Sequence, residues 1–184
     1  MRRAATPLSV DTLRHSILDA WTTSDRTTIF MVERIPDALW NVEVPGTPRK
    51  TVRMLAAHLH NSRRGWIRTL GGPHGLAVPE AVDRRRVTRA ELVRALKSSG
   101  RAMANLLEFG LAQGGRIPPT PAYVWRNLPL DVGHVLAYFV AHEGHHRGQI
   151  LLIARALGKP LSRETVNGLW GWTRFSKAGA KKRR

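Results

Sequence analysis

The chain has 184 residues, of which 42% are hydrophobic, and this favours one globular domain over a disordered chain. It contains no cysteine, which excludes disulfide bonds, thiolate metal ligands and a cysteine nucleophile. No apolar run approaches the roughly 18–20 residues of a membrane-spanning helix, and the basic residues near the N-terminus lack the apolar segment of a secretion signal. We therefore expect a cytoplasmic protein without a membrane segment.

The formal net charge of +17 makes nucleic acid a candidate partner. Part of this charge lies in residues 177–184, which we expect to form a basic tail without regular structure after a single domain of residues 1–176. The other Arg residues are scattered, and no aromatic interleaving or nucleic-acid-binding motif accompanies them. The charge therefore predicts weak, non-specific affinity for nucleic acid, with a dedicated nucleic-acid-binding protein as an alternative.

The first predicted helix runs from Ser9, a favourable N-cap, to about Arg34, with apolar residues at helical spacing. Proline and glycine make residues 36–50 a connection, with one helical turn expected at residues 37–40. A second helix is expected to begin within residues 47–51 and to end before the next Gly-Gly-Pro. Its apolar stripe consists of Val52, Leu55, Ala56, Leu59, Trp66, Ile67 and Leu70.

A third helix is predicted to begin at Thr88, because Thr88 and Glu91 have the spacing of a capping box, and to end near Leu111. A fourth helix is expected to follow the next loop, with Asp131 as its N-cap and Leu157 near its end.

Ser162 is the expected N-cap of a short C-terminal helix that reaches Trp172. Strand signals are almost absent, and Pro and Gly recur in the loops between the four long helices. The pattern predicts an all-α fold, an antiparallel four-helix bundle with a short extra C-terminal helix.

The fourth helix carries a pair of histidines with metal-ligand spacing. His142 and His146 are four residues apart, so their Cβ atoms lie about 5–6 Å from each other and both imidazoles can bind one ion. Both fall on the apolar side of the helix, whereas His145 projects roughly 100° away from the middle of that side. The pair predicts a site for a divalent transition metal, with zinc or nickel as the expected ion.

Two imidazoles leave a metal ion incompletely bound, so a further ligand is expected from a facing helix. The second helix offers His58 and His60. Both flank its apolar stripe, and helical periodicity alone does not choose between them.

Three segments carry a family resemblance. They are the stretch Leu55-Ala-Ala-His58-Leu-His-Asn61-Ser62, the pair His142 and His146 followed by Arg-Gly-Gln, and the ending Leu169-Trp170-Gly-Trp172. From about residue 50 to 172 these segments resemble the DinB/YfiT family of metal-dependent enzymes. The resemblance implies His58 as the third metal ligand, a homodimer, and a small-molecule substrate. Some relatives are thiol transferases or isomerases that use a low-molecular-weight thiol.

Glu143 is expected to face inward, where a carboxylate needs a cationic or metal partner. It is predicted either to pair with an Arg or to transfer protons beside the metal, as the catalytic residue of a metal-dependent thiol transferase or hydrolase.

Two alternatives concern the metal itself. His142 to His146 also match His-Glu-x-x-His, the zinc peptidase helix in which the Glu is the general base. The extended peptidase motif is absent, because Gln149 and Leu152 replace its glycine and third histidine, and there is almost no strand signal to align an extended substrate. A metal that only stabilises the bundle is the other alternative.

Overall fold

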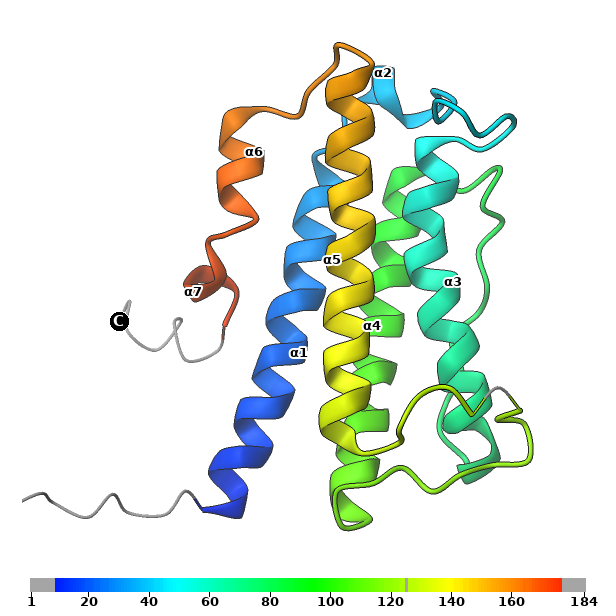
Figure 1. Ribbon diagram of the computed structural model, residues 1–184, viewed down its shortest axis with the longest axis vertical. Coiled ribbons are helices and arrows are strands. Elements are labelled where there is room, and N and C mark those ends of the chain that lie inside the picture. Colours follow the sequence, from blue (N-terminus) through cyan, green and yellow to red (C-terminus); the bar gives the residue numbers. More distant parts are fainter. Residues whose placement is uncertain (1–8, 125, 177–184) are drawn as a thin grey trace, which may run out of the picture.

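Four long helices pack side by side in the computed structural model, which describes residues 9–124 and 126–176 (Figure 1). These helices are α1 (Val10–Glu33), α3 (Val52–Leu70), α4 (Arg89–Ala112) and α5 (Val132–Ala156). The shorter elements are α2 (Asp37–Trp40), the 3-10 helix η1 (Gly72–His74), α6 (Arg163–Gly168) and α7 (Trp172–Phe175). The described residues form two isolated bridges but no strand, which confirms the predicted all-α bundle. The predicted basic tail, residues 177–184, lies outside the described part of the chain.

Local signals start most helices where the sequence predicts. The Ser9 side chain accepts a hydrogen bond from the N–H of Thr12, and Thr88 and Glu91 form the reciprocal capping box. Asp131 precedes α5, but its side chain makes no capping hydrogen bond there. No helix among the described residues is long and apolar enough to cross a membrane.

The predicted C-terminal helix is interrupted, and α6 and α7 are separate short helices. At Gly168, the last residue of α6, an added Cβ would stand 2.6 Å from the ring of Phe30, so α6 and α1 approach closely here. The chain turns after α6, and α7 lies beside α1 (Figure 1).

The long connection between α3 and α4 sets the direction of the helices. It runs back along α3, because Arg64 donates to the carbonyl of Pro79 and Asn61 exchanges two hydrogen bonds with Val82. As a result α3 and α4 point the same way, and α1 and α5 point the other way (Figure 1). Antiparallel neighbours in contact are α1 with α4, α3 with α5 and α4 with α5.

A layer of buried and partly buried polar side chains divides the apolar core into two clusters. One cluster includes Leu55 and Ile150, and the other includes Leu70 and Phe139. Between them the layer consists of Asp25, Thr28, Arg63, Glu143 and Arg147. Burial of charge is costly unless each group has a partner, so the contacts of this layer decide whether the bundle is stable.

Arg63 and Glu143 form the centre of this polar layer and are 1% and 0% exposed. Arg63 Nε donates to Glu143 Oε1 at 2.5 Å, and Thr28 Oγ1 donates to Glu143 Oε2 at 2.6 Å. Arg63 also donates to Asp25 Oδ1 at 2.6 Å, and Arg147 donates to Thr28 Oγ1 at 2.7 Å. Each carboxylate thus has a cationic partner, and the layer joins α1, α3 and α5.

The buried ion pair predicts a large loss of stability in Glu143→Ala. The variant leaves the guanidinium of Arg63 with only one of its two carboxylate partners, Asp25. Breaking a buried ion pair costs about 3–5 kcal/mol. Glu143→Gln keeps the shape and the contact with Thr28, so it should lose less. Urea unfolding measures the free energy of unfolding of each variant. The control is Glu108→Ala, which removes a half-exposed partner of Arg14 and should lose under about 1 kcal/mol of that free energy. A loss in Glu143→Ala no larger than the control would contradict the proposed importance of the layer.

Asp25 predicts a pH dependence of stability. Burial raises its pKa from 3.8 to about 6, against the lowering effect of Arg63. Between these values the native protein binds a proton that the unfolded chain does not, so the contribution of Asp25 to the free energy of unfolding falls as pH rises. The free energy of unfolding of the wild type minus that of Asp25→Asn should fall by about 1–3 kcal/mol from pH 4 to pH 8. A difference that rises with pH would mean that the Arg63 charge outweighs burial.

Candidate metal site

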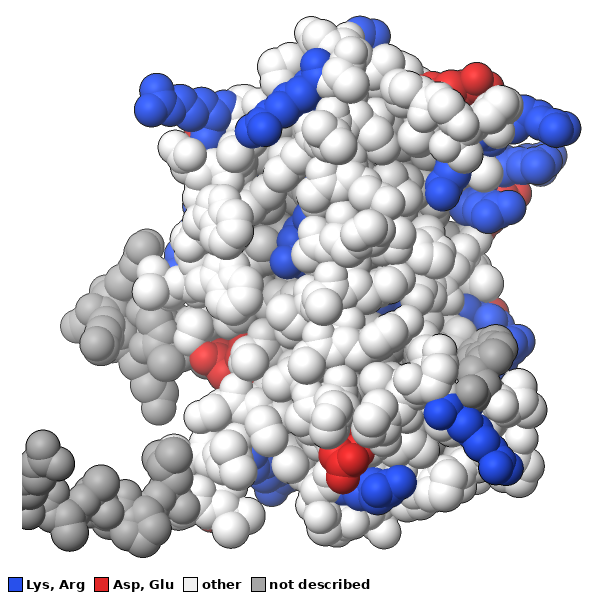
Figure 2. Space-filling model, in the orientation of Figure 1, with Lys and Arg blue, Asp and Glu red and all other residues white. Residues whose placement is uncertain are grey.

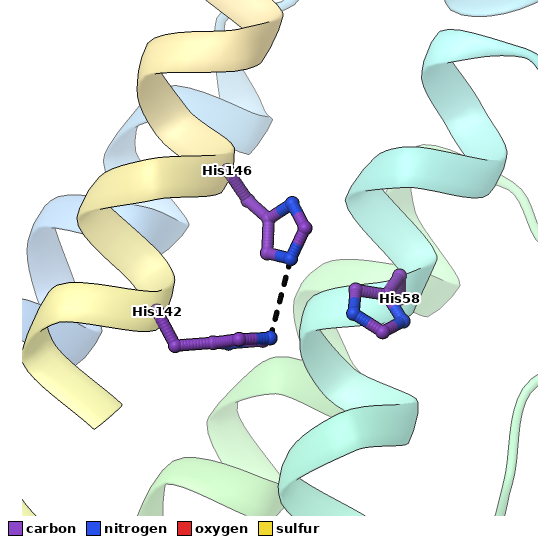
Figure 3. Close-up of side chains that lie close together, drawn as sticks. All are labelled: His58, His142 and His146. Carbon is purple, nitrogen blue, oxygen red and sulfur yellow. Dashed lines mark hydrogen bonds between the residues drawn. The ribbon is translucent and has the colours of Figure 1, made fainter. Parts of the chain in front are cut away.

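Three histidines from two antiparallel helices meet at one edge of the bundle (Figure 3). His58 comes from α3, and His142 and His146 come from consecutive turns of α5. One ring nitrogen of each lies within 4.8 Å of the others, and the Nε2 atoms of His142 and His146 are 3.2 Å apart. Two nitrogens bound to one tetrahedral zinc ion at about 2.0–2.1 Å lie roughly 3.3 Å apart. The pair on α5 therefore has the spacing of two ligands of one metal ion.

Gln149 orients one of these rings. His146 Nδ1 is 2.7 Å from the amide oxygen of Gln149, and an amide oxygen only accepts hydrogen bonds. The Nδ1 of His146 is therefore the protonated nitrogen, and its Nε2 presents a lone pair toward His142 and His58. A partner on the outer nitrogen that fixes the tautomer is typical of metal-binding histidines.

The surroundings of the three rings disfavour protonation. Burial, followed by the neighbouring His146 and His58, lowers the pKa of His142 to about 4. Burial also lowers the pKa of His146 and that of His58, where His146, Lys50 and Arg84 add to the effect. Neutral imidazoles are the form that binds a metal ion, so near neutral pH this donor set fits a divalent cation.

The polar layer determines which way the histidines of α5 point. Glu143 and Arg147 are buried against α1, whereas His142 and His146, each one residue earlier, are half-buried toward α3. The prediction that the pair lies on the buried side of the helix needs this correction: the inward positions hold Glu143 and Arg147. Because His58 is exposed, the cluster lies at the surface of the bundle rather than in its centre.

The structure separates the remaining histidines from the cluster. His60 is fully buried and uses both ring nitrogens, with Ser99 Oγ 3.1 Å from Nδ1 and the carbonyl of Glu80 2.8 Å from Nε2. His145 is exposed and is not one of the three histidines of the cluster, although its ring centroid is 5.0 Å from that of His146. Sequence periodicity could not distinguish His60 from His58. The carbonyl of Glu80, which contacts His60, belongs to a loop whose path the sequence does not predict.

Of the two roles considered for Glu143, the observed contacts are those of the ion pair. Both carboxylate oxygens accept hydrogen bonds within the polar layer. Sequence reasoning missed the main partner, Arg63, which it counted only among the scattered Arg residues. The signal was present, since Arg63 lies four residues after Leu59 and four before Ile67 and thus on the same apolar stripe.

Comparison with known proteins identifies the family of the chain. The profile of the DinB family matches residues 9–170, which include all four long helices and the three histidines. No curated protein and no solved structure matches the chain. On the extent of the profile match, the chain belongs to the DinB family.

Proposed function

We propose that the chain is a metal-dependent enzyme of the DinB type, in which His58, His142 and His146 hold one divalent transition metal ion, zinc or nickel. The observation that carries this proposal is the meeting of three histidine ring nitrogens within 4.8 Å at a surface edge of the bundle. Three protein ligands leave part of the coordination sphere for a substrate, as in catalytic rather than structural sites.

The reaction we propose is thiol transfer or hydrolysis on a small-molecule substrate. In thiol transfer, a low-molecular-weight thiol is the co-substrate. A bound divalent ion supplies Lewis acidity, which lowers the pKa of a thiol or water. The chain positions that ion: Gln149 fixes the tautomer of His146, and Tyr138 stacks on His142 with ring centroids 5.9 Å apart. Glu143 lies next to His142 in the sequence, and proton transfer by its carboxylate remains a prediction.

Two of the alternatives receive less support from the contacts. In a His-Glu-x-x-His peptidase the glutamate acts as the general base, whereas both oxygens of Glu143 are bound by Arg63 and Thr28. A metal that only stabilises the bundle would be expected where helices lack other links, but the polar layer already joins α1, α3 and α5.

The basic surface gives limited support to a nucleic-acid-binding function. Figure 2 shows most Lys and Arg residues of one face in separate groups near its edges, with little basic surface toward its centre. Such a distribution suits weak, non-specific electrostatic binding, which stays our prediction. A homodimer and a cytoplasmic location also stay predictions, which the family resemblance and the composition suggested.

Metal content tests the ligand assignment. His58→Ala, His142→Ala and His146→Ala should each lose most of the bound metal, because each removes one of three ligands, while the wild type holds about one ion per chain. His145→Ala and His60→Ala should keep the metal, and His60→Ala should lower the melting temperature because His60 is buried and bonded. The measurement is elemental analysis by inductively coupled plasma on tag-free, chelator-free protein. Equal loss from His58→Ala and His60→Ala would refute the assignment.

Activity tests the reaction. Metal-loaded protein should accelerate the conjugation of a low-molecular-weight thiol to monochlorobimane, or the hydrolysis of a nitrophenyl ester, by at least about 100-fold over metal-free protein. Fluorescence and absorbance assays with a panel of such thiols and esters measure the rates. His146→Ala should remove the activity and His145→Ala should keep it. Equal rates with and without metal would leave the metal a structural role.

A further inference from the structure

A cavity of about 620 Å³ lies between α1, α4 and α7. We call it the α1–α4 pocket. Since α1 contacts α4 while α3 contacts α5, it lies on the opposite side of the bundle from the histidine cluster. Its volume is within the roughly 300–1,000 Å³ that is usual for small-molecule sites.

Apolar and aromatic side chains form part of the wall of the α1–α4 pocket. Trp21, Ile29 and Phe175 line the pocket with the small parts of their side chains that are exposed, 1%, 8% and 8%. The indole N–H of Trp21 donates to the carbonyl of Gly100 at 2.8 Å, which holds the ring in place between α1 and α4. The wall is therefore ordered before any ligand binds, which lowers the entropic cost of binding.

The charges that line the α1–α4 pocket are mostly positive, with five Lys and Arg residues and two carboxylates. Both carboxylates already have partners, because Asp25 accepts from Arg63 in the core and Glu33 lies 3.6 Å from Arg34. In contrast, Lys97 and Arg101, one turn apart on α4, have no ion-pair partner within the described part of the chain. The pocket therefore has positive charge that an anionic ligand can neutralise.

Arg174 provides a preorganised donor at this pocket. Its guanidinium lies 4.7 Å from the ring centroid of Phe30 and 4.9 Å from that of Phe175. It makes no hydrogen bond to other described residues, and Arg26 holds α7 in place by donating to the carbonyl of Phe175 at 2.6 Å. A guanidinium that stacks on aromatic rings keeps its N–H groups free at its edge, where they match a carboxylate in two parallel hydrogen bonds.

We propose that the α1–α4 pocket binds a small carboxylate with an aromatic or other compact apolar body. The carboxylate binds Arg174, with Lys97 and Arg101 supplying further positive charge, and the apolar body packs against Trp21 and Ile29. This site is separate from the metal site, so the proposal does not depend on the proposed enzyme activity.

Isothermal titration calorimetry with 1-naphthoate tests the proposal on the full-length protein. We expect a dissociation constant on the order of 100 μM, given the modest size of this probe. The neutral analogue 1-naphthol, with the same rings, should bind at least tenfold more weakly. Metal-free protein should bind 1-naphthoate as well as metal-loaded protein does, which distinguishes this pocket from the histidine cluster.

Variants locate the bound probe. Arg174→Leu and Arg101→Leu should each weaken 1-naphthoate binding about tenfold or more, whereas Arg85→Leu, the same change at an exposed loop residue outside the pocket, should not. If Arg174→Leu displaces α7, Arg101→Leu still tests the site, because Arg101 is exposed on α4. A dissociation constant weaker than about 1 mM for the wild type, or unchanged binding in Arg101→Leu, would overturn the proposal.

Discussion

The buried ion pair between Arg63 and Glu143 is the contact on which the candidate metal site depends. It joins α3 to α5, the two helices that supply the three histidines. His58 lies five residues before Arg63, and His142 lies one residue before Glu143, so the pair sets the helix spacing close to the cluster. Such a pair tolerates little displacement, because desolvated charges offset the cost of burial only at hydrogen-bonding distance. The fixed spacing places the ring nitrogens of both helices within reach of one ion before any ion is bound.

Two residue pairs with the same spacing serve different purposes on α5. Glu143 and Arg147 face α1 and bind within the polar layer, while His142 and His146, each one residue earlier, face α3. One residue corresponds to about 100° of rotation, so the inner pair anchors the helix while the outer pair remains available for a ligand. The pattern His-Glu-x-x-His therefore has a structural explanation here that does not involve peptide hydrolysis.

Local signals explain how much of this could be predicted from the sequence. Capping residues such as Ser9 and Thr88 identify helix starts, and the four-residue spacing of His142 and His146 identifies the pair. The partners of Arg63 could not be predicted, because Asp25 and Glu143 lie 38 and 80 residues away and periodicity places a residue on a face without naming what it meets. The direction of α4 could not be predicted either. A connection of this length can run back along α3, which makes α4 parallel to α3, or it can stay near the end of α3, which makes the two helices antiparallel. The choice of His58 over His60 came from the family resemblance, and the loop carbonyl that occupies His60 explains it physically.

The same polar layer also reaches the opposite side of the bundle. Asp25 lines the α1–α4 pocket and accepts a hydrogen bond from Arg63, which donates to Glu143 beside His142. Gly100 makes this arrangement possible, because an added Cβ there would lie 2.5 Å from the Asp25 carboxylate and displace it from its place beside Arg63. Three charged side chains in series thus separate the pocket wall from the histidine cluster. Since buried charges interact strongly in a low-dielectric interior, a change in the charge of Asp25 alters the field at Arg63 and Glu143 directly.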